Sequence, residues 1–158
     1  MAEVPDPEVD EGLGMDTTTV DHTAAAIEIL EALNRRDLED AAARLHPEYR
    51  ASWPDTDLDG HDAFAREIAM LTGLPDTHFA IERATALVDG RVLVEATVSG
   101  THTGELALPY GVAVEATGRA VSLPFLFVMS FVDGLLHRER LAFDHLGLLA
   151  QVGAVPAA

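Results

Sequence analysis

Two Asp-Gly dipeptides constrain the second half of this chain more than any other feature. Asp89-Gly90 and Asp133-Gly134 each lie between two segments rich in β-branched and apolar residues. Asp-Gly favours the positive φ angles of a tight hairpin turn, so each dipeptide predicts a pair of adjacent antiparallel strands. The four predicted strands are 78–88, 91–100, 121–132 and 135–143.

Helical spacing dominates the chain before residue 75. The Ala- and Glu-rich segment 21–34 is amphipathic, and Asp37 is suited to cap a second helix over 38–45. The other predicted elements are a strand at 48–53, an acidic loop of Asp55, Asp57 and Asp59, and helices at 61–71 and 145–152. Helices followed by long antiparallel strands predict an α+β fold, in which a curved antiparallel sheet wraps around the helices and encloses a pocket.

The sequence predicts one domain with short tails. Residues 1–20 carry six acidic residues and no basic one, which is typical of a disordered tail. We assign the domain to residues 21–153 and a C-terminal tail to 154–158. No apolar run approaches the roughly 20 residues of a membrane-spanning helix, and the N-terminus lacks the positively charged start of a secretory signal. We therefore expect a cytoplasmic protein.

The composition excludes several kinds of chemistry. The chain has no Cys and no Lys, and all ten of its basic residues are Arg. A thiol nucleophile, a thiolate metal site and a Schiff base to lysine are therefore excluded. The net charge of −17 argues against nucleic acid and anionic membrane surfaces as partners, because both are bound through cationic side chains.

Four segments carry a resemblance to a known family. They are Ala32–Glu39, Ser99–Glu105, Thr117–Ser122 and Phe143–Gly153. In this order and spacing they resemble the SnoaL-like polyketide cyclases, or ester cyclases, of the nuclear-transport-factor-2-like superfamily. The resemblance implies a cone-shaped α+β barrel with an internal pocket. It also implies a homo-oligomeric enzyme (dimer or tetramer) without cofactor, which closes a ring in a small, largely apolar polyketide ester by intramolecular aldol condensation.

The resemblance implies a catalytic role for Asp144, which matches the family's aspartate at the end of the last long strand. In aldol ring closure a base removes a proton from an activated methylene, and an acid protonates the carbonyl oxygen. A carboxyl group in an apolar pocket has a raised pKa that suits both steps. Asp144 also directly precedes a predicted helix, so a role as the N-cap of that helix is the alternative.

Four further residues are candidate substrate-binding groups. Arg140 shares strand parity with Asp144 and could orient a substrate oxygen, or else meet solvent or another subunit. His102 lies in a Gly-Thr-His-Thr-Gly stretch and could polarise a carbonyl or stabilise a turn. Trp53 and Phe127 offer apolar surface to a flat substrate or to the core. The histidines show no His-x-x-x-His or His-x-His spacing beside a carboxylate, so we expect no metal site.

Two other functions stay open at this point. An epoxide hydrolase, or an epoxide-opening cyclase or isomerase of the same fold, would use two aspartates bridged by an arginine, and the segment 91–97 offers only Glu95. A non-catalytic small-molecule-binding or accessory protein is the second alternative, because one fold hosts many functions. The surroundings of the Asp144 carboxyl distinguish a catalytic residue from a helix cap.

Overall fold

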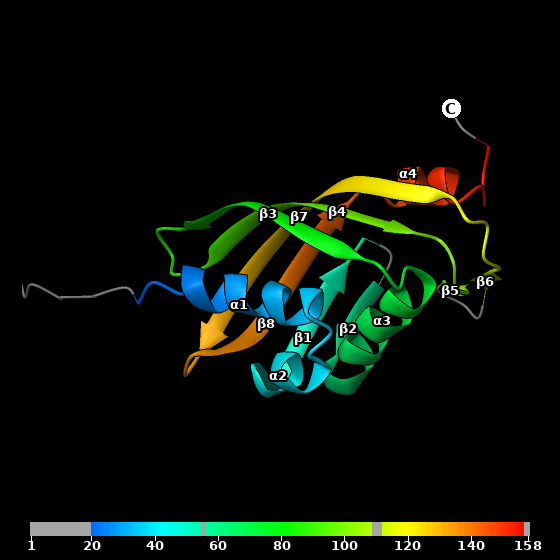
Figure 1. Ribbon diagram of the computed structural model, residues 1–158. Helices are drawn as coiled ribbons and strands as arrows, with labels where there is room; N and C mark the ends of the chain where they lie inside the picture. The colour runs from blue at the N-terminus through cyan, green and yellow to red at the C-terminus, as the bar shows by residue number, and fades with distance from the viewer. Residues whose placement is uncertain (1–19, 55, 109–111, 157–158) are drawn as a thin grey trace, which may run out of the picture.

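A curved six-stranded sheet and a layer of helices form the part of the chain that the computed structural model describes, residues 20–54, 56–108 and 112–156 (Figure 1). The strands are β1 (Leu45–Trp53), β2 (Thr56–Asp59), β3 (His78–Ala86), β4 (Val92–Thr101), β5 (Leu106–Ala107), β6 (Ala113–Val114), β7 (Ala120–Val132) and β8 (Leu135–Phe143). The helices are α1 (Thr23–Asn34), α2 (Leu38–Ala43), α3 (Gly60–Gly73) and α4 (His145–Gln151).

Helices α1, α2 and α3 lie on the same side of the sheet (Figure 1). The buried residues of α1 repeat at the spacing of a single apolar stripe and are Ala26, Ile29, Leu30, Ala32 and Leu33. At the end of α1, the Asn34 amide exchanges two hydrogen bonds with the backbone of Phe79, at 3.0 and 2.8 Å. These bonds satisfy backbone groups on the edge strand β3 and fasten it to the helical layer. Among the described helices, none has the length and apolar character needed to cross a membrane.

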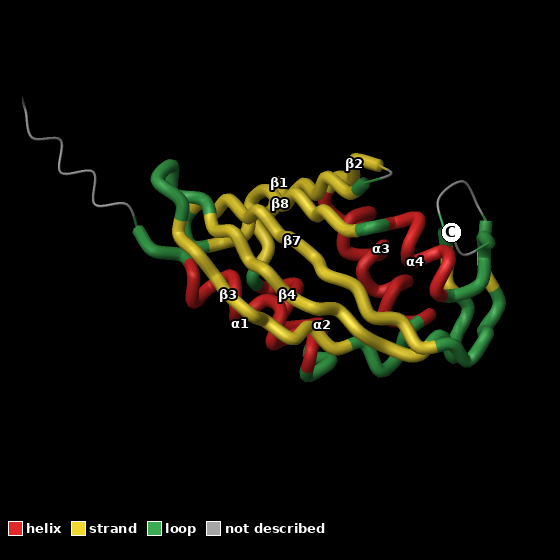
Figure 2. Tube along the Cα trace, turned by 90° about the horizontal axis from the view of Figure 1, so that it is seen from above, coloured by secondary structure: helices red, strands yellow, loops and turns green. Residues whose placement is uncertain are grey.

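The strand order of the main sheet is β2-β1-β8-β7-β4-β3, which Figure 2 shows from above. All neighbouring strands are antiparallel except β1 and β8, which pair in parallel. The β7–β8 hairpin closes through Asp133 and Gly134, whose φ angles of 51° and 78° confirm the predicted tight turn. The first strand of the chain therefore lies beside the last one.

The β3–β4 hairpin has a wider turn than the sequence predicts. Its ladder ends at Ala86 and Val92, so β3 is shorter than predicted and Val88 is fully exposed in the loop. The Asp89 carboxylate accepts the backbone N–H of Arg91 at 3.2 Å and also pairs with its guanidinium at 2.7 Å. This local hydrogen bond from a backbone N–H to a side chain competes with the hydrogen bonding of a two-residue turn.

The segment predicted as an acidic loop contains an edge strand. Asp57 and Asp59 lie in β2, which runs antiparallel to β1, whereas Asp55 falls outside the described residues. The prediction of a loop was wrong for 56–59 because these four residues pair with residues 50–53 of β1. Acidic side chains on an edge strand also discourage pairing with another sheet.

The observed architecture confirms the predicted α+β class with its curved antiparallel sheet. The core fills the space between the helical layer and the sheet, and the inward side chains of β4 and β7 form much of its sheet side. The expected disordered tail at 1–20 lies outside the described residues except for Val20. Of the expected C-terminal tail, residues 157–158 also lie outside them.

Candidate active site

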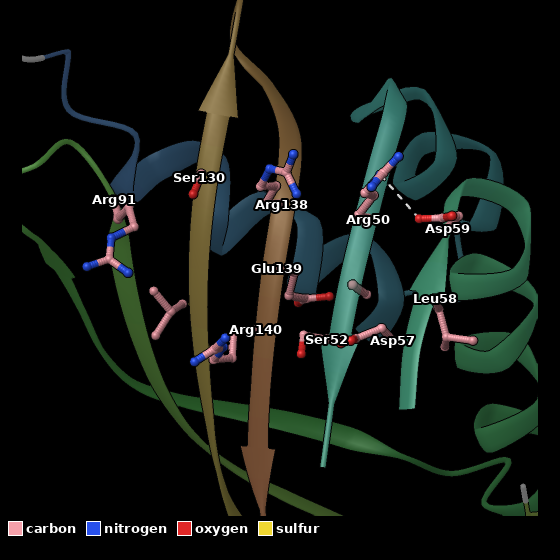
Figure 3. A pocket seen from close by; sticks show the side chains of 12 residues that line it. Arg50, Ser52, Asp57, Leu58, Asp59, Arg91, Ser130, Arg138, Glu139 and Arg140 are labelled. Carbon is pink, nitrogen blue, oxygen red and sulfur yellow. Dashed lines mark ion pairs between the residues drawn. The ribbon is translucent and has the colours of Figure 1, made fainter. Parts of the chain in front are cut away.

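Alternation along β8 directs neighbouring side chains to opposite faces of the sheet. Arg138 and Arg140 are exposed on the outer face, away from α1, α2 and α3, whereas Glu139 between them is only 5% exposed (Figure 3). The side chain of Glu139 turns inward and reaches Tyr49 of β1. The sheet thus separates an inner cavity from an outer hollow.

The inner cavity lies between the helical layer and the sheet and is almost entirely apolar. Its lining residues are Leu33, Trp53, Glu67, Met70, Leu71, Phe79, Phe125, Phe127 and Leu141. The cavity measures about 10 Å³, which is room for about one water. Glu67 is the ionisable member of this lining, so its carboxyl group faces an apolar wall.

Three polar side chains form a hydrogen-bonded group, of which Glu67 lines this cavity and Glu139 borders the outer hollow. They come from different elements: Tyr49 from β1, Glu67 from α3 and Glu139 from β8. The Tyr49 hydroxyl donates to Oε2 of Glu139 at 2.7 Å. The Glu67 and Glu139 carboxyl groups are hydrogen-bonded to each other. A carboxylate has no proton to donate, so one of the two carboxyl groups must be protonated.

Burial raises the pKa of both carboxyl groups. The pKa of Glu67 lies well above its usual value, first because of desolvation and then because of the neighbouring Glu139 charge. Burial also raises the pKa of Glu139, while the hydrogen bonds from Tyr49 and Glu67 act in the opposite direction. The pKa of Tyr49 is raised as well, chiefly by burial, so it stays a phenol. The raised pKa favours the protonated form of Glu67, whereas the hydrogen bonds that Glu139 accepts from Tyr49 and Glu67 favour its carboxylate form.

Trp53 and Phe127, both predicted to bind substrate, line the inner cavity. The guanidinium carbon of Arg66 lies 5.4 Å from the centroid of the Trp53 ring. Phe143 packs edge-on against the same indole, with the ring centroids 6.5 Å apart. Phe127 packs against Phe125 at 6.1 Å in the sheet wall. Both side chains also belong to the buried core, and their contact with a substrate stays a prediction.

The structure places Arg140 in the outer hollow, on the opposite face from the cavity. This hollow measures about 670 Å³, and its lining includes Arg50, Ser52, Asp57, Asp59, Arg91, Ser130, Arg138 and Arg140 (Figure 3). Arg50 pairs with Asp59 at 3.2 Å. Arg138 and Arg140 form no ion pair with any residue in the described part of the chain. Of the roles that the sequence leaves open for Arg140, its place on the outer face agrees with contact to solvent or to another subunit.

Asp144 is exposed and caps α4. Its Oδ1 accepts the backbone N–H of Gly147 at 2.7 Å, and its own backbone is extended, as at a helix N-cap. Asp144 is absent from the lining of the inner cavity. Of the two roles that the sequence leaves open, the geometry shows the cap.

His102 is fully buried and lines neither the inner cavity nor the outer hollow. Its Nδ1 lies 2.9 Å from the Thr117 hydroxyl, and its backbone bonds with Arg119 and Gly118 at 2.9 and 2.8 Å. These bonds hold the loop after β4 against the start of β7. In this position His102 stabilises a loop, which is the alternative that the sequence left open.

Among the residues that the structure describes, one group of side chains has a composition that can bind a metal ion. The ligand atoms of His46, Glu48 and His137 lie within 4.8 Å of one another at the start of β1 and β8. However, Nδ1 of His46 already accepts the backbone N–H of Glu48 at 3.0 Å. A neutral imidazole with this acceptor carries its proton on Nε2, so neither nitrogen is free to bind a metal. We therefore assign no metal site to this group.

Comparisons with known proteins agree with this architecture. The model of the family described as SnoaL-like polyketide cyclase matches residues 24–152. The chain belongs to this family. It is also 29% identical over 135 residues to the aklanonic acid methyl ester cyclase AcmA of Streptomyces galilaeus, with 82% of this chain and 89% of AcmA covered. The predicted family resemblance is therefore confirmed, and it supports an enzymatic function.

Solved structures of similar proteins show the same fold. AclR from Streptomyces galilaeus is 26% identical, with a TM-score of 0.73 that covers 87% of this chain and 83% of AclR. TsrD from Streptomyces laurentii is 25% identical, with a TM-score of 0.67 that covers 84% of this chain and 97% of TsrD. The SnoaL-like chain thus shares its architecture with proteins that differ from it in about three quarters of their residues.

The SnoaL-like sequence contains a signal for the carboxyl pair that our prediction missed. Along α3, Ala63, Met70 and Leu71 are buried, and Glu67 sits four residues after the first and three before the second, on the same stripe. On β8, Glu139 falls between buried Leu136 and Leu141 with the opposite parity to the arginines. An acidic residue at an apolar-face position of two separate elements was the available signal.

Proposed function

We propose that this SnoaL-like protein is a cofactor-independent cyclase that closes a ring in a polyketide-type ester by intramolecular aldol condensation, with Glu139 as base and Glu67 as acid. The observation that carries the proposal is the hydrogen-bonded pair of carboxyl groups beside an apolar cavity. The family and the likeness to AcmA, which is named as a methyl ester cyclase, support the reaction class.

Aldol closure moves one proton from carbon to oxygen. A pair of carboxyl groups can carry out this transfer without a net change in the number of protons that the pair holds. The Glu139 carboxylate removes a proton from the methylene next to the ester and leaves an enolate. The enolate carbon attacks the ketone carbon, and the ketone oxygen takes the proton of Glu67 as the new carbon–carbon bond forms. The proton on Glu139 then passes to Glu67 through their hydrogen bond, which restores the starting pair.

The surroundings of the pair favour this assignment of roles. A base with a raised pKa is better matched to a weak carbon acid than an exposed carboxylate is. Tyr49 donates to Glu139 and not to Glu67, so it stabilises the ionised partner. Burial of two carboxyl groups in contact costs stability, and such an arrangement is expected where function requires it.

Substrate entry requires the helical layer to move. A polyketide ester is much larger than the closed cavity of about 10 Å³. Helix α3 contributes Glu67, Met70 and Leu71 to the lining. Displacement of α3 away from the sheet would widen the cavity and keep the acid at its wall. We therefore propose that α3 opens to admit the substrate and closes over it.

The direct test compares the wild type with Glu139→Gln and Glu67→Gln on a panel of aromatic polyketide methyl esters, with products identified by mass spectrometry. Loss of a positioned acid or base lowers turnover by about 10²–10⁴-fold, and we expect a loss in this range from each variant. Asp144→Asn is the matched control because Asn also caps helices. It should keep wild-type turnover, and circular dichroism checks the fold of all three variants.

Other outcomes would assign a different function. Loss of turnover in Asp144→Asn, with Glu139→Gln unaffected, would move the acid/base role to Asp144. The same carboxyl pair could also open an epoxide, with Glu139 activating water and Glu67 protonating the epoxide oxygen, so epoxides belong in the panel. Turnover of epoxides alone would identify a hydrolase. Binding of esters without any turnover would identify a binding protein.

A further inference from the structure

The indole N–H of Trp53 is a buried donor without a partner. Trp53 is 7% exposed, and its Nε1 finds no acceptor among the residues that the structure describes. A buried donor that lacks an acceptor costs roughly 1–3 kcal/mol, and such a group in a native protein calls for an explanation. The same indole lines the inner cavity together with Glu67.

Contacts on the ring hold this donor in place. The guanidinium of Arg66 lies over the ring face at 5.4 Å from the centroid. Phe143 meets the indole edge-on, and Phe143 is itself stacked on Phe125 at 4.4 Å. Ring contacts on two sides restrict rotation of the indole. The orientation of the N–H is therefore set before any ligand arrives, which is the property of a preorganised donor.

We infer that Trp53 donates a hydrogen bond to the carbonyl oxygen of the substrate inside the cavity. An indole N–H can only donate, so its partner must be an acceptor. A ketone oxygen meets this requirement without adding a negative charge beside the Glu139 carboxylate. The inferred ligand group is thus a neutral ketone attached to an apolar ring, the group that gains negative charge when a carbon–carbon bond forms at its carbon atom.

This inference rests on the proposed function for its catalytic meaning, but not for the hydrogen bond itself. Glu67 and Trp53 line one cavity, so the ketone oxygen that takes a proton from Glu67 can accept a second bond from Trp53. Two donors on one oxygen stabilise the charge that develops there. Trp53 then acts as a binding residue for the electrophilic carbonyl, while the carboxyl pair moves protons.

The chain offers a clean measurement because Trp53 is its single tryptophan. The ¹H–¹⁵N correlation spectrum of the uniformly ¹⁵N-labelled wild type therefore has one indole resonance. The probe is 1-indanone, a bicyclic ketone, and the matched control is indane, which has the same rings without the oxygen. We expect a saturable downfield shift of the indole proton with 1-indanone and no such shift with indane.

Two results would overturn the inference. One is an indole resonance that stays in place up to the solubility limit of 1-indanone. The other is an equal shift with indane, which would show ring contact or displaced water instead of a bond to the carbonyl. The measurement uses the wild-type chain, so it does not depend on the folding of a variant.

Steady-state kinetics of a Trp53 variant test this inference separately from the proposed function. Trp53→Phe keeps an aromatic ring and removes the donor, and loss of one such donor lowers kcat by about 10²-fold. We expect that loss in kcat with little change in KM. Unchanged kcat in Trp53→Phe contradicts the catalytic part of the inference. If Glu139→Gln keeps full turnover while 1-indanone shifts the indole, the proposed acid/base pair fails and the Trp53 hydrogen bond stands.

Discussion

Glu139 lies in a segment whose sequence is typical of an exposed strand, yet its side chain is buried in the fold. It is flanked by Arg138 and Arg140, and a local window of the sequence looks like a charged surface strand. Strand alternation turns only Glu139 inward, where it meets Tyr49 and Glu67. The arginines point to the other face and form no ion pair with Glu139 among the described residues. Glu67 and Tyr49 supply the hydrogen bonds that keep a carboxylate tolerable there.

The carboxyl pair should make the protein less stable as the pH rises. Carboxyl groups in the unfolded chain titrate near 4.5, and those of Glu67 and Glu139 titrate higher in the native state. Above about pH 4.5 the native state therefore binds more protons than the unfolded state. Stability falls with rising pH up to the native pKa, by about 1.4 kcal/mol per pH unit for each extra proton held. Glu67→Gln should flatten this dependence.

The measurement is urea unfolding of the wild type and of Glu67→Gln at about pH 5, 6 and 7. Asp57→Asn is the control, because it removes one exposed acidic group from β2 without touching the pair. It should follow the wild-type slope. Parallel slopes for all three proteins would mean that the pair holds no extra proton in the native state.

Residue type and spacing predicted some site residues and missed others for a physical reason. Trp53 and Phe127 were predicted because large apolar residues on strands usually turn inward. Glu67 and Glu139 were missed because charged residues are usually exposed. The burial of either carboxyl group is tolerable only because Glu67 of α3 contacts Glu139 of β8. This is a tertiary contact, which the local sequence does not indicate.

At the scale of elements, α3 is the part of the wall expected to move. It provides Glu67, Met70 and Leu71, whereas the facing wall is made of hydrogen-bonded sheet strands. Hydrogen exchange of α3 should slow when saturating 1-indanone holds the layer closed, because exchange reports the opening of weakly held elements. The central strand β7 serves as the internal reference and should not change. Equal protection of α3 with and without the ketone would contradict the opening.

The cap of α4 gives a second prediction at this scale. Asp144→Ala removes the bond to Gly147, and loss of an N-cap side chain typically costs about 1 kcal/mol. Asp144→Asn should keep most of that stability. Denaturant unfolding measures both variants, and turnover should stay at the wild-type level in each. A stability loss that is equal for Asn and Ala would contradict a cap.

Element positions followed from the sequence where local chemistry decides them. Asp37 caps α2 through Asp40, and the Asp133-Gly134 turn fixes the β7–β8 hairpin, as predicted. The β2 edge strand was missed because its four residues are stabilised by pairing with β1 and not by their own propensity. The parallel contact of β1 with β8 carried no local signal.

At the scale of the whole molecule, no described element covers the middle strands on one face of the sheet. The outward side chains there include exposed Leu126 and Val132, at 43% and 39%, together with Arg138 and Arg140 of the outer hollow. Exposed Asp57 lies in the same hollow. A second copy related by a two-fold axis can place the acidic groups of one chain opposite the arginines of the other.

We therefore expect a homodimer through this face, which sedimentation equilibrium can measure. Leu126→Glu should shift the protein towards the monomer, because it puts a charge into the apolar part of the contact. Val88→Glu is the control, since Val88 is fully exposed in the β3–β4 loop. A wild type that stays monomeric at high concentration, or a Leu126→Glu variant that stays dimeric, would rule out this interface.

Because β1 pairs with β8, the candidate active site can form only after β8 has been synthesised. The Tyr49–Glu139 bond joins residues 90 positions apart, and β8 is the last strand to leave the ribosome. When β1 and α3 have already emerged, Tyr49 and Glu67 still lack their partner. A nascent chain that ends before β8 therefore has no proton-holding pair and no closed cavity wall. We therefore expect a product that ends before β8 to lack the proposed activity.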